Sequence, residues 1–238
     1  MTRFSRFDLR TTDADAARAF YAKILGHDRA VIWPLHEQAL ARGAKPHWLG
    51  QLGVEDAEQA AAAFIARGAT PLGPTRPNAE GDGQVAVLRD PGGALVAVGS
   101  SPAPSTEPHV DVVWHVLNTN DAARAKINYH DLFGWELTEL VDAGAHGAFQ
   151  QFAWKAGGES VGAIGDISGG SGGRSGVHPH WLFFFEVAAL DVAIAAIRDA
   201  GGSALDSMTL PSGARICVCD DPQGAAFALR ERRRRPLA

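Results

Sequence analysis

The chain of 238 residues contains an internal repeat, and this repeat constrains the fold more than any single motif. Asp13, Tyr21 and Gly26 recur as Asp121, Tyr129 and Gly134, always 108 positions later. His47-Trp48-Leu49 recurs as His180-Trp181-Leu182, and Asp90-Pro-Gly-Gly93 recurs as Asp221-Pro-Gln-Gly224. Because the order is preserved, we interpret the chain as two similar copies in tandem.

The boundary between the copies is predicted at a proline-rich stretch. Residues 100–108 read Ser-Ser-Pro-Ala-Pro-Ser-Thr-Glu-Pro, a composition that disfavours both helix and sheet. We therefore expect a first domain over residues 1–100, a linker over 101–109 and a second domain over 110–232. The remaining residues 233–238 form a basic tail, which continues Arg232 and which we expect to be solvated.

Composition excludes several classes of function. With 46% apolar residues the chain can build buried cores, and its net charge of −5 provides no basic field for nucleic acid. No stretch approaches the apolar length of a membrane span, and the N-terminus lacks the apolar core of a signal peptide. We expect a soluble, cytoplasmic protein. Its only cysteines, Cys217 and Cys219, form no disulfide framework, and as small residues on one side of a strand they could touch a pocket.

Periodicity predicts an α+β fold. Helical spacing of apolar residues, closed by glycine, predicts helices over residues 14–25, 57–67, 121–133 and 189–200, the first with Asp13 as N-cap. Strands are predicted over residues 4–10, 47–54, 84–90, 93–99, 112–118, 135–141, 148–155, 159–166, 180–187, 214–220 and 225–230.

The first copy is shorter than the second. Gly26 and Trp48 are 22 residues apart, whereas Gly134 and Trp181 are 47 apart, so 25 residues are missing. The first sheet should therefore be incomplete, although residues 27–46 mix Val31-Ile-Trp33 with a helical stretch from Glu37 to Ala41. In the second copy the same interval includes a Gly/Ser run over residues 168–176, which we interpret as a linker rather than a phosphate loop.

The repeated residues resemble the vicinal oxygen chelate superfamily, which includes glyoxalases, bleomycin resistance proteins and extradiol dioxygenases. The resemblance rests on Leu9-Arg-Thr-Thr-Asp13, Phe20-Tyr21, Leu25-Gly26, Thr119-Asn-Asp121, Phe133-Gly-Trp-Glu-Leu137 and the two Asp-Pro-x-Gly turns. It implies tandem domains built from paired βαβββ motifs, whose mixed sheets curl into cups with helices outside. Here the first of the four motifs would be truncated.

Enzymes of that superfamily hold a divalent metal with His and Glu side chains on the first, fourth, fifth and eighth strands of a domain. By alignment these positions carry Arg6 and Trp114, then Leu49 and Leu182, then Ala97 and Ala228. The fourth-strand position is missing in the first copy and falls near residues 163–165 in the second, where only Asp166 could serve. Side chains without lone pairs cannot hold a divalent ion. We therefore expect no metal and no cofactor. We interpret His47, His115, His178 and His180 as partly buried histidines with hydrogen-bond partners rather than as metal ligands.

Strand alternation predicts the lining of each cup. In the second copy it comprises Trp114, Val116, Asn118, His180, Leu182 and Phe184, an aromatic pocket with a few polar groups, although core packing is the alternative. His115 should face the opposite side, towards the helices. In the first copy Arg6, Asp8 and Arg10 share one face, where they could bind an anion or form a salt-bridged interface between domains.

Three functions compete. The first is a binding protein that takes an aromatic or heterocyclic small molecule in the second cup without metal. The second is an enzyme of the same group, a lyase, isomerase, hydrolase or dioxygenase, with a non-standard metal site at His178, His180 or Asp166 or with His180 as a metal-free base. The third is an interaction module in which the shortened first domain supports the second or forms a homodimer face. The expected partner is a small molecule, not nucleic acid or membrane.

Overall fold

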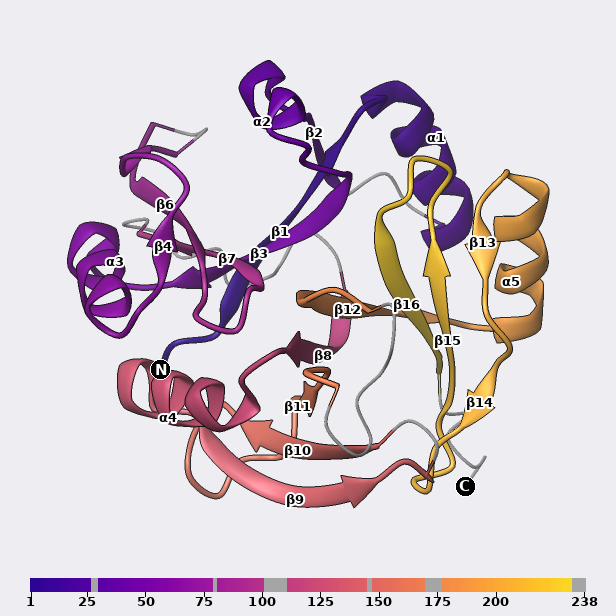
Figure 1. The fold of residues 1–238 in the computed structure, drawn as a ribbon. Helices are drawn as coiled ribbons and strands as arrows, with labels where there is room; N and C mark the ends of the chain where they lie inside the picture. Colours follow the sequence, from indigo (N-terminus) through magenta and orange to yellow (C-terminus); the bar gives the residue numbers. More distant parts are fainter. Residues whose placement is uncertain (27–29, 79–80, 101–110, 145–146, 170–176, 233–238) are drawn as a thin grey trace. The chain divides into compact units, whose positions relative to one another are not determined.

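The computed structural model describes residues 1–26, 30–78, 81–100, 111–144, 147–169 and 177–232 (Figure 1). The predicted linker over 101–109, residues 170–176 of the Gly/Ser run and the tail over 233–238 lie outside the described residues.

The first copy forms α1 (Ala14–Leu25), α2 (Glu37–Ala41) and α3 (Ala57–Ala66), and the second forms α4 (Ala122–Phe133) and α5 (Leu190–Asp199). Strands of the first copy are β1 (Phe4–Thr11), β2 (Val31–Pro34), β3 (His47–Gly53), β4 (Thr70–Pro71), β5 (Arg76–Pro77), β6 (Gln84–Arg89) and β7 (Leu95–Gly99). Those of the second are β8 (Val112–Thr119), β9 (Glu136–Asp142), β10 (Ala148–Ala153), β11 (Gly162–Asp166), β12 (His180–Val187), β13 (Ser203–Ala204), β14 (Met208–Thr209), β15 (Arg215–Asp220) and β16 (Ala226–Glu231).

Each copy of the repeat builds one mixed sheet. The first has the strand order β2-β1-β3-β7-β6-β4, and the second has the order β13-β15-β16-β12-β8-β11-β10-β9. Within both sheets the pairs β3–β7 and β12–β16 are parallel, whereas β6–β7 and β15–β16 are antiparallel. The predicted α+β class with curled mixed sheets is confirmed.

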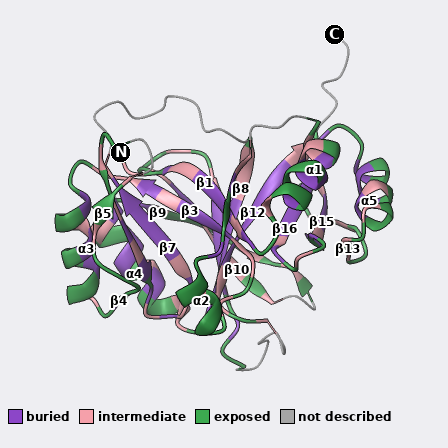
Figure 2. Ribbon diagram, turned by 90° about the horizontal axis from the view of Figure 1, so that it is seen from above, coloured by how far each residue is buried: buried purple, intermediate pink, exposed green. Residues whose placement is uncertain are grey.

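The compact units of the chain do not coincide with the two copies. One unit comprises residues 1–6, 49–108 and 115–181, and the other comprises residues 7–48, 109–114 and 182–238. In the first unit α3 contacts α4, and in the second α1 contacts α5. Figure 2 shows the buried strands and the exposed sides of α3 and α5.

The four long helices match the sequence prediction to within one residue at either end. Helix α1 begins where the Asp13 carboxylate accepts a hydrogen bond from the Ala16 amide at 3.0 Å, and α4 begins where Asp121 accepts from Arg124 at 2.9 Å. Gly26 and Gly134 end these helices with φ of 74° and 72°, a conformation that favours glycine. The same local chemistry thus fixes the same helix in both copies.

The shortened motif keeps its fourth strand. Strand β2 pairs parallel to β1 with Ile32 beside Leu9, as β11 pairs parallel to β8 with Ile164 beside Leu117. Strand β2 is therefore the counterpart of β11, and what the first copy lacks is the hairpin formed by β9 and β10. The expectation that the fourth-strand position is missing in the first copy is wrong: Trp33 occupies the place of Gly165.

None of the described helices has both the length and the apolar character that crossing a membrane would require.

Candidate functional site

Strand β8 presents its alternate side chains to opposite faces of the second sheet. His115 is buried on one face, where its ring stacks on Phe4 at 5.2 Å and its Nδ1 lies 2.8 Å from the Val161 carbonyl oxygen. Burial lowers the His115 pKa to about 4, although the hydrogen bond to Val161 opposes the shift. His115 is therefore a neutral core residue, on the face opposite Val116 and Asn118 as the alternation predicts. We call the face that carries Val116 and Asn118 the inner face.

In the unit that contains residues 115–181, a polar pair occupies the inner face. The Asn118 side-chain nitrogen lies 3.3 Å from Nε2 of His180, and His180 Nδ1 lies 2.7 Å from the His178 carbonyl oxygen. Since an amide nitrogen only donates and a carbonyl only accepts, Nε2 accepts and Nδ1 carries the hydrogen. The pairing of β8 with β11 places Ala163 beside Val116 and Gly165 beside Asn118. The pair is thus a fixed hydrogen-bonding group among small and apolar neighbours.

The other unit carries the apolar part of the same predicted set. Leu182 and Phe184 are buried on β12, and the register places Ala228 of β16 beside Phe184 and Val218 of β15 beside Ala228. Trp114, on the first residues of β8, is part-exposed. The structure brings Asn118 and His180 together, and the prediction that all six side chains line one ligand pocket stays a prediction.

The predicted charged cluster of the first copy lies on β1. The Arg10 guanidinium contacts the Asp8 carboxylate at 3.1 Å and lies 5.9 Å from the centre of the Trp33 ring. Asp8 is buried, whereas Arg6 and Arg10 are part-exposed. Asp8 therefore neutralises Arg10, and binding of an anion at Arg6, Asp8 and Arg10 stays a prediction.

The described residues do not fit a divalent metal. They include no group of three or more His, Cys, Asp or Glu side chains placed to hold an ion. Asp166 accepts a hydrogen bond from the Ser168 amide at 2.8 Å in a local turn, and His178 is exposed. His180 carries an imidazole on the inner face, and the His178 ring lies 5.0 Å from its ring, but Nε2 of His180 is engaged by Asn118. The donor set of a three-ligand or four-ligand site is not assembled there.

Two equivalent buried networks explain the residues that the copies share. In one, Tyr129 donates its hydroxyl hydrogen to Asp90 at 3.3 Å and accepts from the Trp181 indole at 3.4 Å. In the other, Tyr21 donates to Asp221 at 3.1 Å and accepts from Trp48 at 3.0 Å. Burial raises the pKa of Asp90 to about 6 and raises that of Asp221. These ionisable groups are enclosed and mutually bonded, so their role is structural.

Sequence reasoning missed these networks, although their signal was present. Asp, Tyr and Trp recur at matching places in both copies, and a recurring polar residue inside an apolar strand or helix indicates a buried partner. As a sequence pattern, each Asp-Pro-x-Gly segment predicts only a turn. The turn is confirmed, since the Asp90 amide bonds the Ala94 carbonyl at 2.8 Å, but its aspartate also anchors a helix tyrosine.

The cysteine pair lies away from the inner face. On β15, Cys217 pairs with Leu229 and Cys219 pairs with Phe227, whereas the inner-face residue Val218 pairs with Ala228. The hypothesis that these thiols touch the predicted pocket is therefore wrong, because neighbouring residues of a strand face opposite sides.

Comparisons with known proteins agree with this architecture. Residues 109–229 match the family model described as the Glyoxalase/Bleomycin resistance protein/Dioxygenase superfamily. The chain is 26% identical over 252 residues, covering 93% of the chain and 92% of the relative, to a protein of Mycobacterium tuberculosis named "Putative glyoxylase CFP32".

Solved structures of two kinds of enzyme share the fold. The Mn(II)-bound glyoxalase from Novosphingobium aromaticivorans has a TM-score of 0.61 at 12% identity, covering 97% of this chain and 83% of its own. Homoprotocatechuate 2,3-dioxygenase from Brevibacterium fuscum has a TM-score of 0.64 at 16% identity, covering 98% and 81%. At such identities the likeness concerns the fold alone.

Proposed function

Because the chain belongs to the glyoxalase/bleomycin resistance protein/dioxygenase superfamily, we propose that it binds a small aromatic or heterocyclic molecule on the inner face of its second sheet, without a divalent metal. The observation that carries the proposal is the Asn118–His180 pair, a fixed polar group on a face of otherwise small and apolar residues. Small-molecule sites combine such apolar lining with a few placed polar groups.

The polar pair supports recognition of a hydrogen-bonding ligand. Nδ1 of His180 is held by the His178 carbonyl and Nε2 accepts from Asn118, so both side chains are fixed in place. The Asn118 side chain is an amide, which combines an N–H donor with a carbonyl acceptor in one group held against His180. A ring that carries a hydroxyl or an amide group fits this chemistry.

The equivalent face of the first sheet supports placing the proposed ligand site on the second sheet. Position by position along β1, Arg6, Asp8 and Arg10 stand where β8 has Trp114, Val116 and Asn118. An ion-paired surface favours charged partners, whereas the second copy presents an indole, a valine and an amide. An uncharged aromatic ligand is therefore expected to bind the second sheet rather than the first.

The test uses the full chain, stripped of metal, and a library of aromatic and heterocyclic compounds. A compound at about 100 times its Kd stabilises the folded state by about 2.7 kcal/mol, which raises Tm by roughly 5–10 °C for a chain of this size. We expect such shifts in the wild type and their loss in His180→Gln.

His47→Gln is the matched control, because His47 has the same local geometry. Its Nδ1 lies 2.8 Å from the Lys45 carbonyl oxygen, as His180 Nδ1 lies 2.7 Å from that of His178. The control should keep the ligand shift. Shifts that survive in His180→Gln, or a broad library without any hit, would contradict the proposal.

A catalytic role is the second candidate, favoured by the names of the relatives, which include a glyoxylase and dioxygenases. In that case a lyase, isomerase, hydrolase or dioxygenase would use His180 as a metal-free base or would hold an ion at His178, His180 or Asp166. Turnover of a bound compound, and a stoichiometric divalent ion in protein purified without chelator, would distinguish the enzyme from the binding protein.

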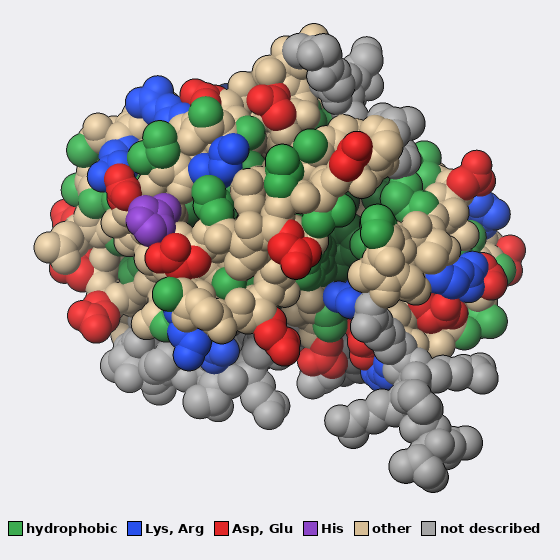
Figure 3. Space-filling model, turned by 90° about the horizontal axis from the view of Figure 1, so that it is seen from below, with side chains coloured by type: hydrophobic (Ala, Val, Ile, Leu, Met, Phe, Trp, Pro, Cys, Tyr) green, Lys and Arg blue, Asp and Glu red, His purple; other side chains and the backbone are tan. Residues whose placement is uncertain are grey.

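The proposal also covers partners and location. Lys and Arg side chains lie scattered among Asp and Glu side chains on the face shown in Figure 3, which supports a small molecule rather than nucleic acid or a membrane as partner. The proposed location is the cytoplasm. Light scattering on the purified chain tests for the homodimer.

A further inference from the structure

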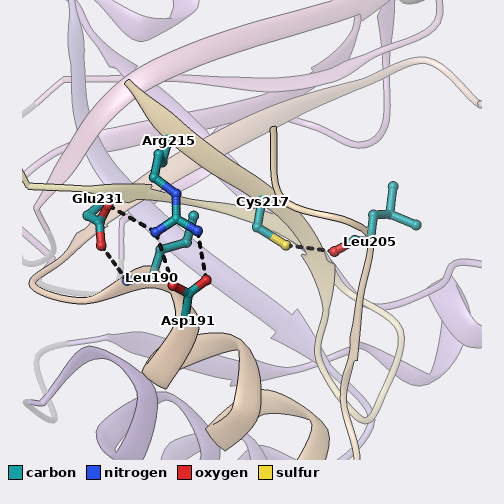
Figure 4. A network of polar contacts seen from close by, with 6 residues as sticks. All are labelled: Leu190, Asp191, Leu205, Arg215, Cys217 and Glu231. Atoms are coloured by element: carbon teal, nitrogen blue, oxygen red, sulfur yellow. Dashed lines mark hydrogen bonds and ion pairs between the residues drawn. The ribbon is translucent and has the colours of Figure 1, made fainter. Parts of the chain in front are cut away.

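We propose that Cys217 and Cys219 form a two-thiolate binding site for Cu(I), on the face of β15 opposite the inner face. The two sulfur atoms lie 3.6 Å apart, and Cys217 Sγ lies 3.1 Å from the Leu205 carbonyl oxygen (Figure 4). The side chains of residues i and i+2 of a strand point to the same side, which is why both thiols converge. This site is independent of the proposed ligand site.

The strand geometry favours a bridging ion over a disulfide. At about 3.3–3.4 Å per residue, the two Cα atoms are roughly 6.6–6.8 Å apart, the upper end of the range of about 4.4–6.8 Å that a disulfide tolerates. A disulfide would also bring the sulfurs to about 2.0 Å and distort β15. Two thiolate–metal bonds of about 2.3 Å, the length found at zinc, span sulfur separations up to about 4.6 Å, and the separation of 3.6 Å lies within that reach.

The surroundings hold β15 in place and bury both thiols. Arg215, at the start of β15, contacts Asp191 of α5 at 2.7 Å and Glu231 of β16 at 3.3 Å (Figure 4). Cys217 and Cys219 are only 1% and 2% exposed, but Leu205, whose carbonyl accepts from Cys217, is 65% exposed. The segment between β13 and β14 therefore joins an exposed residue to the buried Cys217 thiol.

The choice of ion follows from the donors and their charges. No third His, Cys, Asp or Glu joins the pair within the described residues, so the ion must accept two sulfur ligands, and soft thiolates select Cu(I). The Cys219 thiol donates a hydrogen bond to Cys217 Sγ at 3.6 Å, so the two sulfur donors already face each other.

Binding exchanges protons for the ion without any redox step. Each thiol releases its proton to solvent as a sulfur–copper bond forms, and copper enters and stays as Cu(I). The resulting complex carries one negative charge, which the Arg198 guanidinium, bonded to the Ala204 carbonyl at 3.2 Å, partly balances.

The experiment titrates the reduced full chain with Cu(I) without oxygen, in competition with the chromophoric chelator bicinchoninate. We expect one Cu(I) per chain to leave the chelator, with loss of this transfer in Cys217→Ser and in Cys219→Ser. Met208→Leu is the control for soft sulfur ligands: Met208 of β14 pairs with Ile216 of β15, so it shares the sheet face of Ile216, opposite to the two thiols. It should bind as the wild type does.

X-ray absorption of the copper-loaded wild type keeps the test independent of how the serine variants fold. Two sulfur neighbours around copper support the proposal, and nitrogen or oxygen neighbours overturn it. Failure of the folded wild type to take Cu(I), binding by either serine variant equal to that of the wild type, or closure of a Cys217–Cys219 disulfide under mild oxidant would each overturn it.

Discussion

Replacing Asp90 by asparagine tests the energetics of the buried network in which it lies. The Asp90 side chain is 3% exposed, accepts a hydrogen bond from the Ala94 amide at 2.9 Å and accepts another from Tyr129 at 3.3 Å. Burial raises its pKa from 3.8 to about 6, although these hydrogen bonds oppose the shift. The folded chain therefore keeps a proton on Asp90 at pH values where the unfolded chain has released it.

The sign of the pH dependence follows from this difference. Between pH 3.8 and about 6 the folded state binds more protons than the unfolded state, so the free energy of unfolding falls as pH rises through this window. A shift of about two pKa units corresponds to about 3 kcal/mol over the whole window. About 1.4 kcal/mol of this change falls between roughly pH 5 and pH 7.5.

Urea unfolding followed by tryptophan fluorescence measures the effect at a series of pH values. The unfolding free energy of the wild type minus that of Asp90→Asn should increase by about 1.4 kcal/mol when pH is lowered from roughly 7.5 to 5. Asp199→Asn, at an exposed position, controls for the loss of one charge. Asp221→Asn should give a change of the same sign, since burial also raises the Asp221 pKa. A difference that is constant or that shrinks on acidification would refute the reasoning.

Three further substitutions probe the scaffold and the ligand face. Tyr129→Phe leaves the Trp181 indole and the Asp90 carboxylate without their shared partner, so it should lower the free energy of unfolding by about 1–3 kcal/mol in urea titrations. Gly92→Ala should lower the free energy of unfolding by about 1–3 kcal/mol, because the added Cβ would overlap Oγ1 of Thr119. In a double-mutant cycle, the same substitution should lower it less when Thr119 is already replaced by alanine. Phe184→Ala and Trp114→Ala should abolish the Tm shift produced by the ligand, and a full shift in both would place the ligand elsewhere.

The sequence predicted the elements whose signal is local. Helices α1 and α4 have an aspartate N-cap, a helical stripe and a closing glycine, and all three signals lie within about a dozen residues. Strand β2 has no such signal, because its four residues include Trp33 and Pro34 and show no alternation. Only its pairing with β1 reveals it as the fourth strand of the motif.

The sequence could not predict which residues contact each other when they lie far apart in the chain. Repetition marks Asp90 and Tyr129 as important, but it cannot decide whether Asp90 pairs with Tyr21 of its own copy or with Tyr129 of the other. That choice depends on packing, which joins Asp90 to Tyr129 and Asp221 to Tyr21. By contrast, alternation along β8 and β12 needs only a period of two, so it placed Asn118 and His180 on one face before their contact was known.

The repeat also separates scaffold from chemistry. The residues that the copies share have structural roles. The aspartate, tyrosine and tryptophan of each network are hydrogen-bonded to one another, and the glycines end helices. The copies differ instead on the inner face and on its equivalent in the first sheet. Arg10, at the position equivalent to Asn118, forms an ion pair with Asp8, whereas Asn118 donates a hydrogen bond to His180. Since the same backbone supports both faces, the difference between them cannot be required for folding. We therefore expect the proposed ligand preference to depend on residues at which the two copies diverge, and to be a property of the second copy.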